Sequence, residues 1–214
     1  MNKIFKIALD FDDVIYSTNA MIIDTFTEHG LGREEALSFM RQWGLVGAPQ
    51  EIIKAVKDKF GDPAFSCDQK RIMKESKDWI EKHKDIIDFI VVTARPESIA
   101  AETKAFIAEH VGIKNVFVEP KSKTNTLIQQ KVDFIIDDGC HNLQPFFEPK
   151  SNITPILVST PLTVYNHSSA EILGKRNLVV SRLADISVEY LKEVKVRRAK
   201  SRITSIEKGN NYAF

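Results

Sequence analysis

The chain has 214 residues, which suits one α/β domain with room for an insertion. Its hydrophobic content of 43% and charged content of 28% are ordinary for a soluble globular protein, and its formal net charge of +1 gives no strong attraction for nucleic acid or membranes. The two cysteines, Cys67 and Cys140, lie far apart, which favours a reducing compartment and argues against a disulfide framework. No apolar run approaches the roughly 18 residues that span a bilayer. Aspartates interrupt the first apolar run, so we interpret the N-terminus as a strand rather than a signal peptide, and we expect a cytoplasmic protein with no membrane partner.

Six short apolar runs, rich in Val, Ile and Phe, recur along the chain. They are too short for helices and do not alternate cleanly with polar residues, which is typical of strands buried on both faces. The runs cover residues 4–10, 88–96, 115–120, 132–139, 153–160 and 177–181. Helical patterns at 97–110 and 122–131 lie between them. Strands that alternate with helices predict an α/β fold, a Rossmann-like three-layer core around a parallel sheet.

Residues 17–85 differ from the rest, because they contain no convincing strand. Helix-like segments at 19–29, 33–43, 49–59 and 68–83 are separated by Gly and Pro. We expect this region to be a small helical cap inserted after the first strand. The core would then consist of residues 1–16 and 86–190, followed by a basic C-terminal helix or tail at 191–214.

The C-terminal region is strongly basic. Residues 192–208 carry seven Lys or Arg against two Glu, a net charge of +5. Two interpretations stay open: a solvated helix end with a frayed tail, or an arm that binds RNA, a nucleotide or a partner protein.

The stretch "IALDFDDVIYS" at residues 7–17 places three carboxylates, Asp10, Asp12 and Asp13, within four positions at the end of the first strand. Like charges this close repel each other, and a half-buried strand end strengthens the repulsion. A cation therefore binds there or the acids take part in chemistry. Because residues i and i+2 of an extended segment point to the same side, we expect Asp10 and Asp12 to face a ligand while Asp13 turns away.

Polar residues also follow the other predicted strands, and in a parallel sheet these ends share one rim. They are Thr93, Ala94 and Arg95 after the second strand, Lys121 and Lys123 after the third, and Asp137 and Asp138 at the end of the fourth. Clustered carboxylates without His or Cys ligands suit Mg²⁺. A lysine and a threonine hydroxyl beside the metal would hold a phosphoryl group, one aspartate could act as a nucleophile, and a second could transfer protons.

Four segments, "DFDDV", "VVTAR", a lysine within 121–123, and "IIDDG", occur in the order of the four motifs of the haloacid dehalogenase-like superfamily of phosphotransferases, which the chain resembles. Within that superfamily, "TARP", "KTNTL" and "DFIIDDGCHNLQPF" are most similar to the 5′(3′)-deoxyribonucleotidases and their bacterial and phage relatives. The resemblance implies a Mg²⁺-dependent phosphatase.

The resemblance assigns catalytic roles to particular residues. Asp10 would be the nucleophile and a metal ligand, and Asp12 the general acid/base, with its backbone carbonyl on the metal. Thr93 and the backbone amides of Ala94 and Arg95 would hold the phosphoryl oxygens. Lys123 matches the family's lysine better than Lys121 does, because Thr124 follows it.

The resemblance also implies a metal shell. Asp138 would complete it, and Asp137 would orient a metal-bound water. The first motif departs from the family pattern, since Asp13 stands where many members have Gly. For substrate recognition, Tyr16 is the aromatic residue best placed to stack on a nucleobase. Three other aromatic residues of the cap could stack on the base or form the cap's own core: Phe26, Phe39 and Trp43.

Simpler structural roles compete with these assignments. Asp10 and Asp12 could end a strand at an exposed turn, Thr93 could cap a helix, the lysines could lie on the surface, and Asp137 and Asp138 could cap the next helix.

Taken together, the motifs predict a phosphomonoester hydrolase acting on a small-molecule phosphoester, a nucleoside 5′-monophosphate first of all. The alternatives are another small phosphoester, a nucleic-acid 3′-phosphate, or a non-catalytic binding protein on the same fold. We expect no nucleic-acid partner, and a homodimer is compatible with the sequence.

Overall fold

The computed structural model describes residues 3–41, 45–148, 151–159, 171, 173, 174 and 178–210, with the backbone alone for 201–210. Its centre is a six-stranded sheet in the order β3-β2-β1-β4-β5-β6, in which every pair of neighbours is parallel. The strands are β1 (Phe5–Leu9), β2 (Ile87–Thr93), β3 (Val116–Val118), β4 (Phe134–Asp137), β5 (Thr154–Val158) and β6 (Val179–Val180). Five of them lie within the apolar runs predicted from the sequence, and β2 begins one residue before its run.

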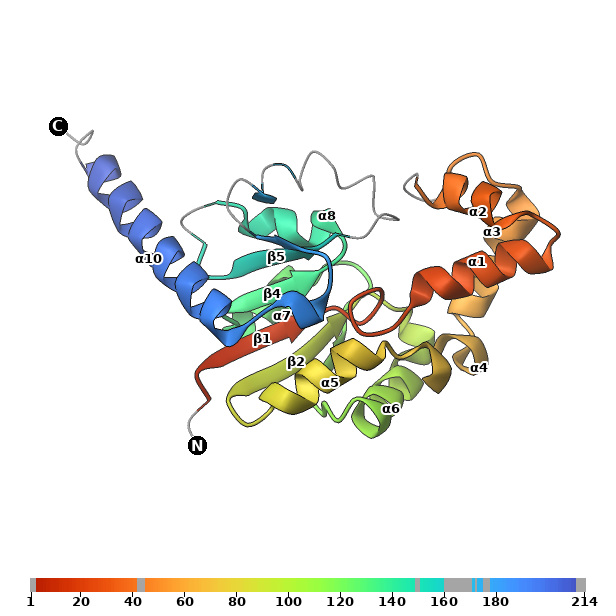
Figure 1. Cartoon of the computed structure of the whole chain (residues 1–214), viewed down its shortest axis with the longest axis horizontal. Coiled ribbons are helices and arrows are strands. Elements are labelled where there is room, and N and C mark those ends of the chain that lie inside the picture. Colours follow the sequence, from red (N-terminus) through yellow and green to blue (C-terminus); the bar gives the residue numbers. More distant parts are fainter. Residues whose placement is uncertain are drawn as a thin grey trace.

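Helices lie on both sides of this sheet, which confirms the predicted Rossmann-like α/β fold (Figure 1). The α-helices are α1 (Thr18–Glu28), α2 (Arg33–Met40), α3 (Gln50–Phe60), α4 (Pro63–Ser66), α5 (Lys74–His83), α6 (Ala100–His110), α7 (Thr124–Gln129), α8 (Cys140–Leu143) and α10 (Val188–Asn210). Short 3-10 helices among the described residues are η2 (Gln69–Arg71), η3 (Glu97–Ile99), η4 (Gln144–Phe146) and η6 (Leu183–Asp185). In the part of the chain that the structure describes, no helix has the length and apolar character needed to cross a bilayer.

The chain order places a topological switch point between β1 and β4. From β1 the chain builds the sheet outward through β2 and β3, and then returns to add β4, β5 and β6 on the other side. Leu9 pairs with Ile136, so the residues that follow these two strands emerge side by side. In open α/β sheets this crevice at the carboxyl ends of the strands is where ligands bind.

The cap is joined to the core by two adjacent connections. The Ser17 amide donates to the Arg71 carbonyl and the Met73 amide donates to the Ile15 carbonyl, each at 2.8 Å. Between these connections, α1, α2 and α3 enclose a small apolar cluster of their own, which includes Phe26 and is separate from the core of the sheet. Figure 1 shows these three helices to one side of the sheet.

Helix α5 packs differently, although it falls within the range 17–85 expected for the cap. Trp79 and Ile80 are buried in the main core, and the Trp79 ring meets Phe89 of β2 edge-on with ring centroids 5.4 Å apart. The Trp79 indole also donates to the Ile186 carbonyl at 2.7 Å. We therefore propose that the cap ends near residue 73 and that α5 belongs to the layer covering the sheet. Its helical pattern alone could not reveal against which layer it packs.

The basic C-terminal segment continues from α10, a helix whose first turns are packed on the core. Leu191 and Val194 are buried, and Arg198 Nη2 donates to the carbonyls of Phe146 and Glu148 at 3.2 Å each. The far end of the helix extends away from the sheet (Figure 1). Residues 211–214 of the expected tail lie outside the described residues.

Candidate active site

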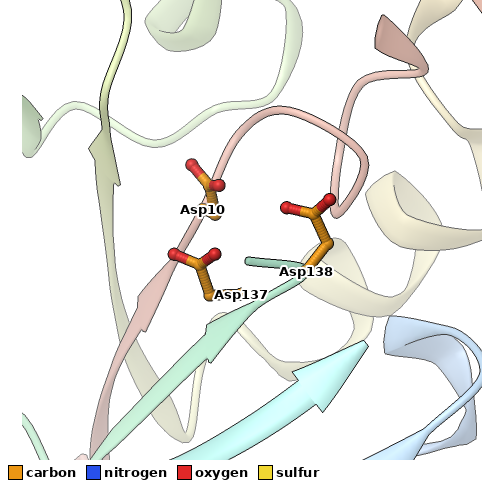
Figure 2. Close-up of side chains that lie close together, drawn as sticks. All are labelled: Asp10, Asp137 and Asp138. Carbon is orange, nitrogen blue, oxygen red and sulfur yellow. The ribbon is translucent and has the colours of Figure 1, made fainter. Parts of the chain in front are cut away.

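Three carboxylates gather at the switch point. Asp10 follows β1 directly, and its amide donates to the Ile136 carbonyl at 2.8 Å, which fixes it beside the end of β4. Asp137 is the last residue of β4, and Asp138 follows it. One oxygen from each of the three carboxylates lies within 4.8 Å of the others (Figure 2). The predicted convergence of the first and fourth motifs is present in the structure.

Lys123 lies between two of these acids. Its Nζ is 2.8 Å from Asp10 Oδ1 and 2.7 Å from Asp137 Oδ2, and the side chain is only 2% exposed. Burial alone would lower the pKa of Lys123, but Asp10 and Asp137 outweigh it and raise the pKa above the ordinary value. Lys121 is exposed on the loop. Of the two candidate lysines, Lys123 is therefore the one that touches the carboxylate cluster.

The Asp137 carboxylate is held by the loop that follows it. Its Oδ1 accepts hydrogen bonds from the Gly139 amide at 2.7 Å and from Asn142 Nδ2 at 3.1 Å. A Cβ at Gly139 would lie 3.1 Å from that same oxygen and 2.8 Å from the His141 ring, so a larger residue here would force the His141 side chain to move. With Lys123 on the other oxygen, Asp137 is rigidly oriented by its neighbours.

Asp12 is bound by an arginine. Arg95 Nη2 is 2.9 Å from Asp12 Oδ1 and Arg95 Nε is 3.1 Å from Oδ2, while the Thr18 hydroxyl also donates to Oδ1. Burial would raise the pKa of Asp12, but Arg95 and then Thr18 outweigh burial and the pKa is lowered. The Thr93 hydroxyl makes only a long contact of 3.4 Å with Asp12 Oδ2. Asp12 keeps 18% of its side chain exposed, so it stays accessible beside the cluster.

Asp13 has a distinct role in the loop. Its φ of 54° lies in the left-handed region, where Gly is most at ease and Asp is tolerated. The Asp13 carboxylate turns to α1, where Oδ1 accepts from the Asn19 amide at 3.0 Å. Burial, with Asp12 adding to it, raises the pKa of Asp13 to about 7.

Burial and like charge dominate the electrostatics of the cluster. Burial raises the pKa of Asp10 to about 8, with Asp137 adding to the effect and Lys123 opposing it. Burial followed by the charges of Asp13 and Asp137 raises the pKa of Asp138 well above its usual value. One lysine thus compensates only part of the negative charge gathered here.

The chemistry of the donor set suits a hard divalent cation. Asp10, Asp137 and Asp138 offer carboxylate oxygens, the ligand type that Mg²⁺ prefers, and no His or Cys is among them. A divalent cation would also compensate the negative charge that Lys123 leaves unbalanced.

Thr93 and its neighbours form the adjoining part of the rim. Thr93 is fully buried at the end of β2, and the Arg95 amide approaches its hydroxyl at 3.4 Å. Ala94 is exposed between them. The backbone of this turn is placed beside Asp12, but the Arg95 side chain is turned into the protein, where it is 0% exposed.

The position of Tyr16 does not fit the prediction that its ring stacks on a nucleobase. The residue is 0% exposed, its ring stacks on Phe11 with centroids 5.1 Å apart, and its hydroxyl donates to the Phe65 carbonyl at 3.0 Å. No ring face is left for a ligand in this structure, so Tyr16 acts here as a core residue.

The other cap aromatics pack on each other where they are described. Phe26 is buried and stacks with Phe39 at a centroid distance of 5.7 Å, as the interpretation of these residues as cap core predicts. Trp43 lies outside the described residues.

Two residues of the site, Thr18 and Asn142, were missed by the sequence analysis, as was the role of the Arg95 side chain. Thr18 and the Arg95 side chain both bind Asp12, and Asn142 binds Asp137. Asn142 follows the fourth motif closely, so its proximity was a usable signal. For Arg95 the sequence indicated only a backbone role, and no pattern predicts which way a side chain turns at a strand end.

Comparison with known proteins gives a fold. No family model matches the chain, and no curated protein matches it either. Among solved structures, a haloacid dehalogenase-like hydrolase from Burkholderia xenovorans matches with a TM-score of 0.55 and 11% identity over 87% of this chain and 97% of its own. A beta-phosphoglucomutase from Clostridium difficile matches with a TM-score of 0.52 and 14% identity over 91% and 98%. The chain has the fold of haloacid dehalogenase-like hydrolases. At such low identity the comparison extends to the fold alone.

Proposed function

We propose that the protein is a Mg²⁺-dependent phosphomonoester hydrolase that works through an aspartyl-phosphate on Asp10. The observation that carries this proposal is the position of Lys123, buried between Asp10 and Asp137 within the three-carboxylate cluster at the switch point. Buried charges are costly and seldom stabilise a fold, so such a cluster is better explained by function. One solved structure with this fold is a beta-phosphoglucomutase, and its name denotes an enzyme of phosphoryl transfer, which supports the proposed type of reaction.

The proposed reaction assigns a step to each carboxylate beside the rim. An Asp10 oxygen attacks phosphorus, and the bond to the leaving oxygen breaks. Asp12 would enter this step protonated, against the lowered pKa that Arg95 gives it in the free protein, and would donate that proton to the leaving oxygen. Water then attacks the phosphorus of the aspartyl-phosphate, Asp12 accepts its proton, and phosphate leaves while Asp10 is restored. Lys123 and the hydroxyl and amides at 93–95 would stabilise the charge on the phosphoryl oxygens.

Asp10, the Asp12 carbonyl and Asp138 would hold the Mg²⁺, with Asp137 orienting a water of its shell. The metal would supply positive charge that offsets the repulsion between the carboxylates and the phosphate. Lys123 already holds Asp10 in place through its 2.8 Å contact.

For the substrate we propose a (deoxy)nucleoside 5′-monophosphate, on the strength of the motif details "TARP", "KTNTL" and "DFIIDDGCHNLQPF". Tyr16 is left out of the proposed substrate contacts because it is buried. A cytoplasmic location, a homodimer and the absence of a nucleic-acid partner stay predictions.

The test is phosphate release from nucleoside monophosphates, other small phosphoesters and a 3′-phosphorylated oligonucleotide, with Mg²⁺ and with EDTA. We expect release from 5′-nucleotides that needs Mg²⁺ and falls by at least about 10³-fold in Asp10→Asn. Asp133→Asn is the matched control, because Asp133 binds Lys195 Nζ at 2.7 Å at the opposite end of β4.

Each other outcome contradicts a defined part of the proposal. Release from a different ester alone would overturn the nucleotide assignment, and equal rates in EDTA would overturn the metal. No release from any ester by folded wild-type protein would favour a binding protein on this fold.

A further inference from the structure

Arg95 is a fully buried cation with contacts on two sides. On the core side, its Nε and Nη2 bind the Asp12 carboxylate at 3.1 and 2.9 Å. On the cap side, its Nη1 donates to the Ser66 carbonyl at 2.5 Å. Ser66 ends α4, in the segment that returns from the cap to the core. A guanidinium has five N–H donors in a rigid plane, so one side chain can hold both partners at once.

Aromatic rings fix the plane of this guanidinium. Its central carbon lies 4.5 Å from the ring centroid of Phe11, 4.9 Å from that of Tyr16 and 5.6 Å from that of Phe60. Phe11 and Tyr16 belong to the loop after β1, whereas Phe60 ends α3 of the cap. Such contacts favour a cation that has been removed from water. The cap therefore supplies part of the pocket in which Arg95 lies.

Both connections of the cap are linked to Asp12, the outgoing one directly and the returning one through Arg95. On the outgoing connection, the Thr18 hydroxyl at the start of α1 donates directly to Asp12 Oδ1. On the returning connection, the Tyr16 hydroxyl donates to the Phe65 carbonyl at 3.0 Å, next to the carbonyl that Arg95 binds. A change in how the cap sits would shift the donors that orient Asp12.

We propose that Arg95 is a positioning residue that ties the returning segment of the cap to the Asp12 carboxylate, so that cap position and carboxylate orientation are set together. The kinetic consequence rests on the proposed function, in which Asp12 protonates the leaving oxygen. The Arg95 side chain does not contact the substrate, because it has no exposed surface. Lysine cannot replace it, since a single ammonium lacks the planar fork that spans Asp12 and Ser66.

The kinetic test compares two esters by kcat/KM, which reports the steps up to departure of the leaving group. An alkyl phosphate such as a nucleoside monophosphate needs its leaving oxygen protonated, whereas 4-nitrophenyl phosphate does not. In Arg95→Lys we expect the aryl-to-alkyl ratio of kcat/KM to rise by about 10²-fold. Asp12→Asn should raise the ratio too, and the double variant should add little, because the two residues act as one unit.

Matched controls separate positioning from general damage. Arg71→Lys makes the same substitution in the returning segment, where Arg71 Nη2 binds Asp24 Oδ2 at 2.9 Å, and should leave the ratio unchanged. An equal loss for both esters in Arg95→Lys would overturn the proposal.

A milder variant tests the cap side without emptying the buried site, in case Arg95→Lys fails to fold. Phe60→Leu loosens the ring that the cap places on Arg95 and should raise the ratio severalfold. Phe65→Leu is its control, because the Phe65 ring is half-exposed and lies under Lys59, with the Lys59 Nζ 5.2 Å from its centroid. An unchanged ratio in Phe60→Leu would count against the coupling.

A readout without catalysis distinguishes failure of this proposal from failure of the proposed function. Coupling is reciprocal, so loss of the Asp12 charge should loosen the cap segment that Arg95 holds. In Asp12→Asn we expect faster amide hydrogen exchange at Ser66, Cys67 and Asp68, with no change in Asp133→Asn. If wild-type protein hydrolyses neither ester but the exchange responds, the phosphatase proposal fails and the coupling holds. Unchanged exchange would overturn the coupling in either case.

Discussion

The rim of the sheet and the cap are built from different interactions. At the rim, Asp10, Lys123 and Asp137 form a chain of ionisable groups that is almost completely removed from water. In the cap, the core is a small apolar cluster around Phe26 and Ile52, and charged pairs such as Lys54 and Asp58 lie at its surface.

This difference explains why the residues of the rim indicate a function more clearly than the residues of the cap do. Buried ion pairs often contribute less to stability than apolar residues of similar size would, so their presence indicates a chemical role. Apolar packing and surface ion pairs are what any folded helical unit needs, and they carry little information about a ligand. The type of reaction can therefore be argued from the residues of the rim. The substrate cannot be inferred in the same way from the cap, because the cap's contacts are those of any folded helical unit.

The two regions should differ most in the free energy of unfolding that is lost when a paired lysine is replaced in each of them. Lys123→Met would leave Asp10 and Asp137 buried without their cation, so we expect a loss of about 3–5 kcal/mol in the free energy of unfolding. Lys54→Met removes an exposed i,i+4 pair with Asp58 and should cost less than about 0.5 kcal/mol. Urea denaturation at neutral pH without metal measures both. Equal losses would mean that the rim charges are as well solvated as those of the cap.

The sequence predicted the sheet and the rim better than the cap, for physical reasons. Strands buried on both faces, such as β2, must be continuously apolar, and the rim residues follow from where those strands end. We predicted that Tyr16 contacts the ligand because it follows the aspartates. It is buried instead, as are Phe11, Val14 and Ile15 of the same loop. A loop has no hydrophobic periodicity from which the burial of its residues could be predicted. The direction of the Arg95 side chain depends on Asp12 and Ser66, which come from distant parts of the chain.

The second prediction uses pH to separate the rim from the rest of the protein. Without metal, Asp10 keeps its proton up to about pH 8 and Asp13 up to about pH 7 when folded, while unfolded aspartates lose theirs near pH 4. Between these values the folded state binds more protons, so stability falls as pH rises, by at most about 1.4 kcal/mol per pH unit for each group. Asp12 has a lowered pKa, and its contribution is lost only in acid.

Metal should reverse this dependence, because carboxylates bind Mg²⁺ only after losing their protons. Thermal unfolding measured in EDTA and in excess Mg²⁺ between about pH 5 and about pH 8 tests both points. We expect Tm to fall with pH in EDTA, the stabilisation by Mg²⁺ to grow with pH, and Asp10→Asn to flatten the first slope. A Tm that rises with pH in EDTA, or no Mg²⁺ effect at the upper end, would contradict the assignment of the cluster.

The smallest effect is expected from the far end of α10, which extends away from the sheet (Figure 1). Arg198 anchors this helix to the core, and Leu191 and Val194 supply its buried face. Because this end of the helix leads away from the sheet, removal of residues 201–214 should change kcat/KM for a small phosphoester by less than about twofold. The full-length protein is the control, and Tm shows whether the fold is kept. A nucleic-acid substrate would behave otherwise, since the deleted segment removes Arg202 and Lys208, and affinity for a polyanion would fall and become less dependent on salt. A large, salt-dependent loss of activity on an oligonucleotide 3′-phosphate would thus show that the basic helix takes part in substrate binding, in addition to the rim and the cap.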